Sequence, residues 1–230
     1  MSKIFITGGK GILGSKLVLS LLSNHDVYAP DKKDCDITNL SEVKNAINQY
    51  QPDIVIHAAA YVDTFGCEKN PISAIDTNII GTINLVKSIL ELSCKFVYIS
   101  SEYVFGGDRG YYTVEDKLDP KNIYGKTKAS SEYIVSILEN YQIIRAPFIR
   151  KVYPKVFTDQ YCSRYFLDEA VQKIIYNIMN NNDKIVHIAT ERMSLYDLYI
   201  NKGIYADPIT MDEHFLQVIP KDTSLINNSI

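Results

Sequence analysis

Tyr124 and Lys128, four residues apart, are the pair of side chains best suited to acid–base chemistry in this chain. Chance predicts one or two Tyr-x-x-x-Lys pairs in so tyrosine- and lysine-rich a sequence, and the other pair, Tyr28 and Lys32, is interrupted by Pro30. The Tyr124 pair begins a predicted helix, where this spacing puts both side chains on one face. A cation near a phenol lowers a pKa that is ordinarily about 10. We predict that Tyr124 exchanges a proton with a carbonyl or alcohol oxygen; a core tyrosine beside a solvated lysine is the alternative.

Ser101 is the third candidate for this chemistry. It follows a predicted strand, at the carboxyl edge where doubly wound sheets bind ligands. Its hydroxyl could donate a hydrogen bond to the same substrate oxygen, whereas the alternative role of such a serine is to form a turn or a cap.

A glycine loop lies between the first predicted strand and the first predicted helix. Gly8, Gly11 and Gly14 form G-x-x-G-x-x-G, with Ile12 and Leu13 inside the motif. Such glycines allow a tight turn, close approach of a pyrophosphate and close packing of helix on strand. The helix N-terminus adds free N–H groups and a positive dipole end. The motif predicts a dinucleotide site and, without Gly-Lys-Ser/Thr, argues against ATP hydrolysis.

The end of the second predicted strand bears on the choice between NAD and NADP. An acidic residue there binds the ribose hydroxyls of NAD, and basic residues bind the 2′-phosphate of NADP. Both are present, because Asp31 is followed by Lys32 and Lys33. The lysines favour NADP, with NAD as the alternative. Asp36, followed by Ile37, is a candidate for the adenine amine or a helix cap.

These residues are carried by strands and helices that alternate along the first 146 residues. Alternating strands and helices imply right-handed crossovers and a parallel sheet covered on both faces. The sequence therefore predicts an α/β fold with a doubly wound, Rossmann-like parallel sheet. The strands are expected at Lys3–Thr7, Asp26–Ala29, Ile54–Ala58, Lys95–Ser100 and Gln142–Ala146, and the helices at Ile12–Leu22, Thr38–Tyr50, Pro71–Leu92 and Asn122–Glu139.

The regular alternation of predicted strands and helices ends at Pro147. Residues 147–230 contain one predicted helix, Leu167–Met179, one clear strand, Lys184–Ala189, and much irregular sequence. We therefore expect residues 1–146 to form a dinucleotide-binding domain and residues 147–230 a small, shortened substrate-binding lobe over the carboxyl edge of the sheet.

Composition excludes several classes of protein. The 230 residues are 46% hydrophobic and carry a net charge of −3, which argues against disorder and nucleic-acid binding. No apolar run is long enough to span a membrane, and the start does not resemble a signal peptide. The four cysteines and four histidines are scattered, so we expect reduced thiols, no metal site and a cytoplasmic location.

Taken together, these motifs resemble the extended short-chain dehydrogenase/reductase family, and within it the group of dTDP-4-dehydrorhamnose reductases. The similarity covers essentially the whole nucleotide-binding part, and Pro220–Leu225 resembles the closing element of these reductases, so we expect the chain to end as they do. The matching segments are Ile6–Gly14, Cys35–Thr38, Pro52–Tyr61, Cys67–Pro71, Asn78–Leu85, Phe96–Gly107 and Tyr124–Lys128.

The resemblance implies a role for each matching residue. Ser101, Tyr124 and Lys128 would form the catalytic triad, with Lys128 also bonding the nicotinamide ribose. Gly8, Gly11 and Gly14 would bind the phosphates, and the small side chains of Ala58, Ala59 and Ala60 would line the cofactor channel. Related dehydratases carry an Asp-Glu pair after the serine; Glu102-Tyr103 stands here, so reduction is favoured over dehydration. Relatives are often dimers, which implies a homodimer.

The leading interpretation is NAD(P)H-dependent reduction of a nucleotide-linked 4-keto-6-deoxy sugar. The segment between Pro147 and Gln160 is much shorter than the corresponding loop and helix of relatives, which bind the nucleotide sugar. Two alternatives therefore stay open: a sugar-nucleotide epimerase that retains its cofactor, and a non-catalytic nucleotide-binding subunit of a larger enzyme.

Overall fold

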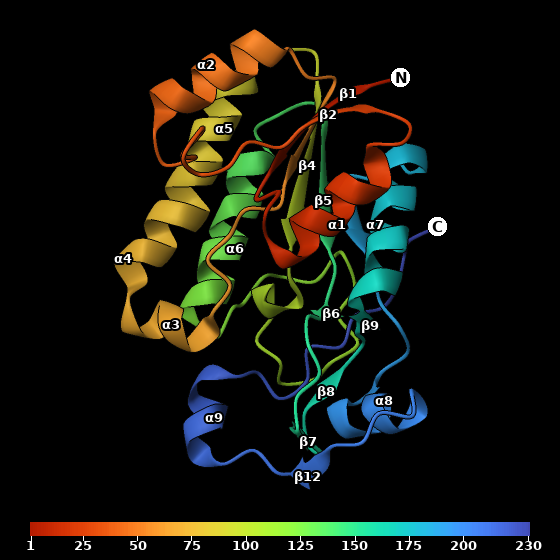
Figure 1. Ribbon diagram of the computed structural model, residues 1–230. Coiled ribbons are helices and arrows are strands. Elements are labelled where there is room, and N and C mark those ends of the chain that lie inside the picture. Colours follow the sequence, from red (N-terminus) through yellow and green to blue (C-terminus); the bar gives the residue numbers. More distant parts are fainter.

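The structure is a computed structural model that describes residues 1–230, and its centre is a six-stranded parallel sheet (Figure 1). The strand order is β10-β5-β4-β3-β1-β2, and every neighbouring pair is parallel. β1 thus has β2 on one side and β3 on the other, which makes its carboxyl end a topological switch point. The strands are β1 (Lys3–Thr7), β2 (Asp26–Tyr28), β3 (Ile54–His57), β4 (Lys95–Ser100), β5 (Tyr141–Arg145) and β10 (Ile185–His187).

Helices cover both faces of the sheet, as the alternating sequence predicts (Figure 1). One face carries α1 (Ile12–Leu21) and α7 (Leu167–Asn180), whose buried aliphatic side chains pack on the strands. The other carries α2 (Leu40–Tyr50), α5 (Gly81–Ile89) and α6 (Ile123–Val135). The doubly wound, Rossmann-like fold is therefore confirmed. No helix is both long enough and apolar enough to cross a bilayer.

Capping residues explain where the helices begin. The Asn39 side chain accepts hydrogen bonds from Ser41 and Glu42, so α2 begins at Leu40 and not at Thr38 as predicted. Asn122 is the cap of α6, because its side chain accepts a bond from the Gly125 N–H at 2.7 Å. The predicted end of α6 at Glu139 was too late, since the regular helix ends at Val135.

The predicted helix from Pro71 to Leu92 is less regular than expected. It runs as α4 (Pro71–Ala74), a π-helical stretch (Ile75–Ile80) and α5, which ends at Ile89. A short helix that the sequence reading missed, α3 (Thr64–Lys69), precedes it. Asn78, in the π-helical stretch, donates to Thr127 of α6 at 2.9 Å and thereby ties it to the helix that carries Tyr124.

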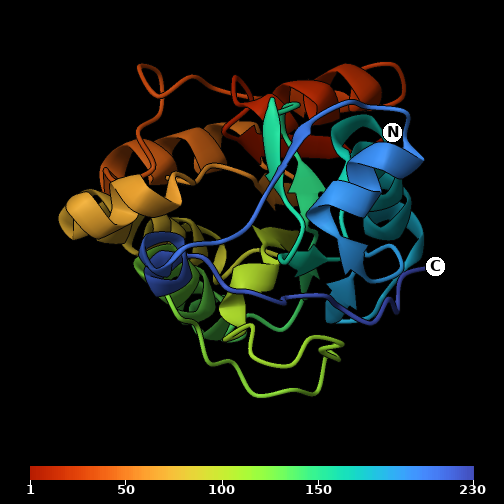
Figure 2. The same cartoon turned by 90° about the horizontal axis from the view of Figure 1, so that it is seen from below.

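The segment 147–230 is divided between the sheet and a small lobe. α7 packs on the sheet and β10 forms its edge. The remainder lies below the carboxyl ends of the strands (Figure 1). In the view from below, α9 (Glu213–Val218) lies beside α3 (Figure 2), and Phe65 of α3 stacks on His214 of α9. This lobe contains β6 (Phe148–Ile149), β7 (Lys155–Phe157), β8 (Tyr161–Cys162), β9 (Tyr165–Phe166), β11 (Met193–Ser194), α8 (Leu195–Asn201), β12 (Asp207–Ile209) and α9 (Glu213–Val218).

Candidate active site

The glycine loop turns at the carboxyl end of β1, at the switch point of the sheet. Gly8 has a φ of +71°, which only glycine adopts without strain. A Cβ on Gly14 would lie 2.1 Å from the Gly8 carbonyl oxygen, so glycine is required for α1 to approach the loop. A Cβ on Gly11 would meet only that same oxygen, at 3.1 Å, and otherwise faces open space. The loop therefore presents bare backbone at the start of α1.

Two adjoining cavities meet at this loop. One, of about 400 Å³, is lined by Gly11, Ile12, Leu13 and Gly14, and the other, of about 260 Å³, by Gly8, Gly11, Ile37 and Asp36. Ala58 and Ala60 line both cavities, and Ala59 lines the smaller one. The resulting cleft is elongated and has glycine backbone at its middle, which suits a dinucleotide whose phosphates lie at the loop.

Ion pairs organise the charged residues of the smaller cavity. Lys10, in the glycine loop, pairs with Asp31 at 2.6 Å, and Lys32 pairs with Asp36 at 3.5 Å. The second Asp31 carboxylate oxygen accepts the Lys32 N–H at 2.7 Å. The acidic residue best placed to bind ribose hydroxyls is therefore already engaged, while two lysines line the same cavity.

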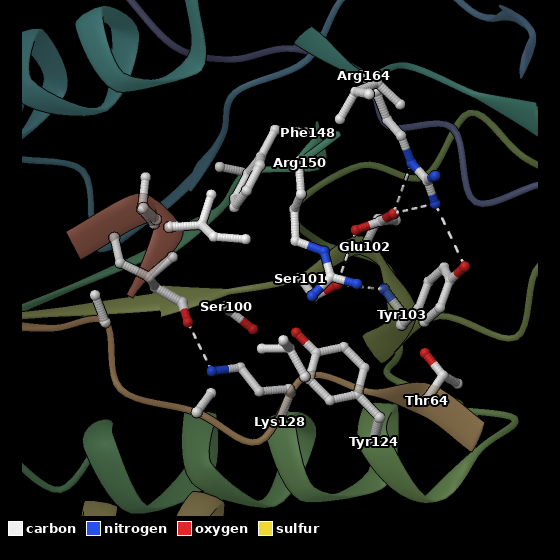
Figure 3. A pocket seen from close by; sticks show the side chains of 18 of the residues that line it. Thr64, Ser100, Ser101, Glu102, Tyr103, Tyr124, Lys128, Phe148, Arg150 and Arg164 are labelled. Atoms are coloured by element: carbon white, nitrogen blue, oxygen red, sulfur yellow. Dashed lines mark hydrogen bonds and ion pairs between the residues drawn. The ribbon is translucent and has the colours of Figure 1, made fainter. Parts of the chain in front are cut away.

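Ser101, Tyr124 and Lys128 all line the larger cavity, although they come from distant parts of the chain (Figure 3). Ser101 follows β4, while Tyr124 and Lys128 stand one turn apart on α6. Ser101 and Lys128 are buried, whereas Tyr124 is partly exposed to the cavity. The three predicted residues and the glycine loop thus share one space.

The Lys128 ammonium is turned toward the sheet. It donates a hydrogen bond to the Ile99 carbonyl at 2.7 Å and lies 4.0 Å from the centre of the Tyr98 ring. Burial lowers the pKa of Lys128 to about 7, and the nearby Glu132 carboxylate opposes this shift only in part. Lys128 is therefore a cation that can change its protonation state near neutral pH.

The pKa of Tyr124 is raised, and burial of its side chain is the largest cause. Burial and the Glu102 carboxylate raise the pKa of Tyr124, and Ser101 and Arg150 act in the opposite direction. The Lys128 ammonium, which was expected to lower this pKa, is hydrogen-bonded to the Ile99 carbonyl. Without ligands, Tyr124 is thus a protonated phenol, ready to donate a proton.

Ser101 is held by a buried ion pair that sequence reasoning did not identify. Its hydroxyl donates to Glu102 at 2.8 Å, and the other Glu102 oxygen accepts from Arg164 at 2.7 Å (Figure 3). Arg164, from the lobe, also lies 3.4 Å from the Tyr103 hydroxyl. Glu102 entered the sequence prediction only with Tyr103, as the pair that stands where dehydratases carry Asp-Glu, and nothing in the local sequence pointed to its partner 62 positions away.

A second buried ion pair stabilises α6 behind the cavity. Glu132 lies one turn after Lys128. Its two carboxylate oxygens accept three hydrogen bonds from Arg145 of β5, the shortest of which is 2.7 Å. Glu132 also accepts a hydrogen bond from Ser100 at 2.5 Å. Because Ser100 precedes Ser101, this network orients both the strand end and the helix that carry the predicted triad.

The sequence and the fold of this chain are similar to those of known proteins. The sequence model of the RmlD substrate binding domain matches residues 2–191. A crystal structure of dTDP-4-dehydrorhamnose reductase from Bacillus anthracis in complex with NADP superposes with a TM-score of 0.86, at 28% identity, over 99% of this chain and 91% of that chain.

Similar sequences occur among characterised proteins. The spore coat polysaccharide biosynthesis protein SpsK of Bacillus subtilis is 34% identical over 65% of this chain and 54% of its own length. The dTDP-4-dehydrorhamnose reductase of Aggregatibacter actinomycetemcomitans is 33% identical over 63% and 50%. Methionine adenosyltransferase 2 subunit beta of Mus musculus is 32% identical over 60% and 43%. The matches thus span about half the length of these relatives.

Proposed function

The chain belongs to the RmlD substrate binding domain family, and we propose that it reduces the keto group of a nucleotide-linked 4-keto-6-deoxy sugar with NADPH. The observation that carries the proposal is the cavity that joins the glycine loop to Ser101, Tyr124 and Lys128. The reductase and NADP named for the Bacillus anthracis structure support the reaction and the cofactor. Gly11 lines both cavities, and the open space beside its backbone fits a pyrophosphate.

Each proposed catalytic residue has a distinct task. NADPH, when bound, supplies the hydride. Tyr124 donates its phenolic proton to the carbonyl oxygen as that oxygen becomes an alkoxide, which its protonated state permits. Ser101 polarises the same oxygen, and to do so its hydroxyl hydrogen turns from Glu102 toward the substrate. Lys128 provides positive charge beside the developing phenolate.

We propose NADP over NAD because of the smaller cavity. Lys10 and Lys32 line it, and the Asp31 carboxylate is occupied by Lys10 and by the Lys32 N–H. A 2′-phosphate on the ribose offers these two lysines a stronger partner than the single carboxylates of Asp31 and Asp36 do.

The remaining assignments follow from the same proposal. Residues 1–146 with α7 and β10 form the dinucleotide-binding domain, and the lobe that begins at β6 binds the sugar nucleotide. All four cysteines are free and buried, which fits a reducing compartment, and we propose the cytoplasm. We also propose a homodimer, which sedimentation equilibrium can test.

Consumption of NADPH tests the proposed function. The purified chain is mixed with NADPH and a panel of dTDP- and UDP-linked 4-keto-6-deoxy sugars, and absorbance at the reduced-nicotinamide band is followed. We expect turnover with at least one substrate and its loss in Tyr124→Phe. The matched control is Tyr133→Phe, an exposed tyrosine on the same helix, which retains activity. Full turnover in Tyr124→Phe would contradict the assignment.

A nucleotide-binding subunit of a larger enzyme is the second candidate. The observation that favours it is the similarity to methionine adenosyltransferase 2 subunit beta of mouse, which is named as a subunit of another enzyme. Affinity purification from the native host that yields a stoichiometric partner, together with no NADPH consumption on any keto sugar, would support this candidate over the reductase.

A further inference from the structure

Arg150 is the single arginine of this chain that has no carboxylate partner. The chain has five arginines, and the other four each form an ion pair: Arg109 with Asp116, Arg145 with Glu132, Arg164 with Glu102 and Arg192 with Asp222. The planar guanidinium of an arginine offers five donors in a rigid fork that matches a carboxylate or a phosphate. Arg150 is exposed to solvent and also lines the larger cavity, so its guanidinium is free to bind a ligand there.

The location of Arg150 supports that interpretation. It directly follows β6, whose pairing with β9 anchors the backbone, and its side chain lines the larger cavity. Figure 3 shows the guanidinium extending from the lobe side into the space above Ser101 and Tyr124. Its charge reaches the Tyr124 hydroxyl, where it favours the phenolate. Arg150 and the reacting groups thus face one another across the space for the substrate.

The other charged side chains of this cavity are already engaged. Glu102, its only acidic residue, is neutralised by Arg164 at 2.7 Å. The Lys128 ammonium is bound to the Ile99 carbonyl. The same cavity is also lined by apolar and aromatic side chains, among them Phe148, Ile149, Tyr153, Leu195 and Tyr199. The cavity therefore has uncompensated positive charge at Arg150 and no competing carboxylate there.

We propose that Arg150 binds an anionic group of the substrate, a sugar-linked phosphate or a sugar carboxylate, and thereby places the reacting carbonyl at Ser101 and Tyr124. A guanidinium matches the two oxygens of either group with parallel hydrogen bonds. The proposal rests on the proposed function, because it names the feature by which that site selects its substrate. It makes Arg150 the anchor that the shortened lobe contributes.

Calorimetric titration of the full chain, saturated with NADP⁺, tests this proposal without requiring turnover. The probes are dTDP, dTDP-glucose and dTDP-glucuronate, which differ in sugar and carboxylate. The variants are Arg150→Gln, Arg150→Lys, and Lys151→Gln as the matched control, since Lys151 is the next residue but does not line the cavity. NADP⁺ affinity and thermal unfolding report whether each variant is folded.

We expect Arg150→Gln to weaken binding by roughly 10- to 100-fold, the usual effect of losing a charged hydrogen-bonding group. Arg150→Lys should recover part of the loss, and Lys151→Gln should bind as the wild type does. Equal weakening for all three probes identifies the phosphate as the anion, and weakening confined to dTDP-glucuronate identifies a carboxylate.

Two results would overturn the proposal: wild-type affinity of Arg150→Gln for all three probes, or no binding of any probe to the wild-type chain. The reductase proposal fails independently, if the wild-type chain binds these probes through Arg150 but consumes NADPH with no keto sugar.

Discussion

Replacing Lys128 with methionine should stabilise the folded chain while abolishing turnover. Lys128 is 2% exposed, and burial lowers its pKa from 10.5 to about 7. The unfolded chain takes up the Lys128 proton as the pH falls through about 10.5, but the folded chain does so only near 7. Lys128 therefore lowers the free energy of unfolding progressively as the pH falls through this window, and the full penalty applies below it.

The size of the effect follows from these values. The two titration points correspond to about 4 kcal/mol of lost stability at pH 7 and about 1–2 kcal/mol at pH 9.5. Methionine removes this penalty but leaves the Ile99 carbonyl without its 2.7 Å hydrogen bond, which costs about 1 kcal/mol or somewhat more. We expect Lys128→Met to be more stable by on the order of 2–3 kcal/mol at pH 7, and the gain to disappear at pH 9.5.

Urea unfolding at pH 7, 8 and 9.5 measures this difference. The matched control is Lys126→Met, which replaces an exposed lysine of the same helix and should show a difference from the wild type that is independent of pH. The reasoning would be refuted if the free energy of unfolding of Lys128→Met differed from that of the wild type by the same amount at all three pH values. Lys128 would then titrate alike in the folded and unfolded chains.

Three further substitutions test other parts of the site. Gly14→Ala forces a Cβ to within 2.1 Å of the Gly8 carbonyl, so we expect at least tenfold weaker NADPH binding by fluorescence titration and a lower melting temperature. Lys10→Met should weaken NADPH binding about tenfold and leave NADH binding unchanged, since only NADPH carries the 2′-phosphate; an equal effect on both would argue against the NADP site. Ser101→Ala should lower kcat by roughly 10- to 100-fold with little change in KM, and a change confined to KM would remove Ser101 from catalysis.

The sheet and the glycine loop could be predicted because their signals are local. Apolar strands alternate with helices, and the loop from Gly8 to Gly14 lies directly after the first strand. The predicted helix starts were off by one or two residues where a capping side chain decides them, as Asn39 does for α2. The π-helical stretch Ile75–Ile80 could not be recognised from the spacing of apolar residues, because a single π-helical turn shifts the helical periodicity of that spacing only slightly.

The arrangement of charges in the site could not be predicted, because it depends on long-range pairing. The sequence indicates that Tyr124 and Lys128 share one face of a helix. It does not indicate that the Lys128 ammonium turns toward the backbone carbonyl of Ile99 in β4. Nor does it show that Arg164 neutralises Glu102 while Arg150 stays unpaired. The placement of the two arginines depends on how the lobe packs against the sheet, for which the irregular sequence after Pro147 gives no periodic signal.

Transfer of deuterium from NADPH to a sugar tests the central claim most directly. The chain is incubated with NADPH deuterated at the nicotinamide C4, in each stereoisomer, and with a dTDP-linked 4-keto-6-deoxy hexose, and the sugar is analysed by mass spectrometry and NMR. The account predicts one deuterium at the former carbonyl carbon with one of the two stereoisomers, and an equal amount of NADP⁺ formed. A sugar recovered without deuterium from both stereoisomers would contradict it.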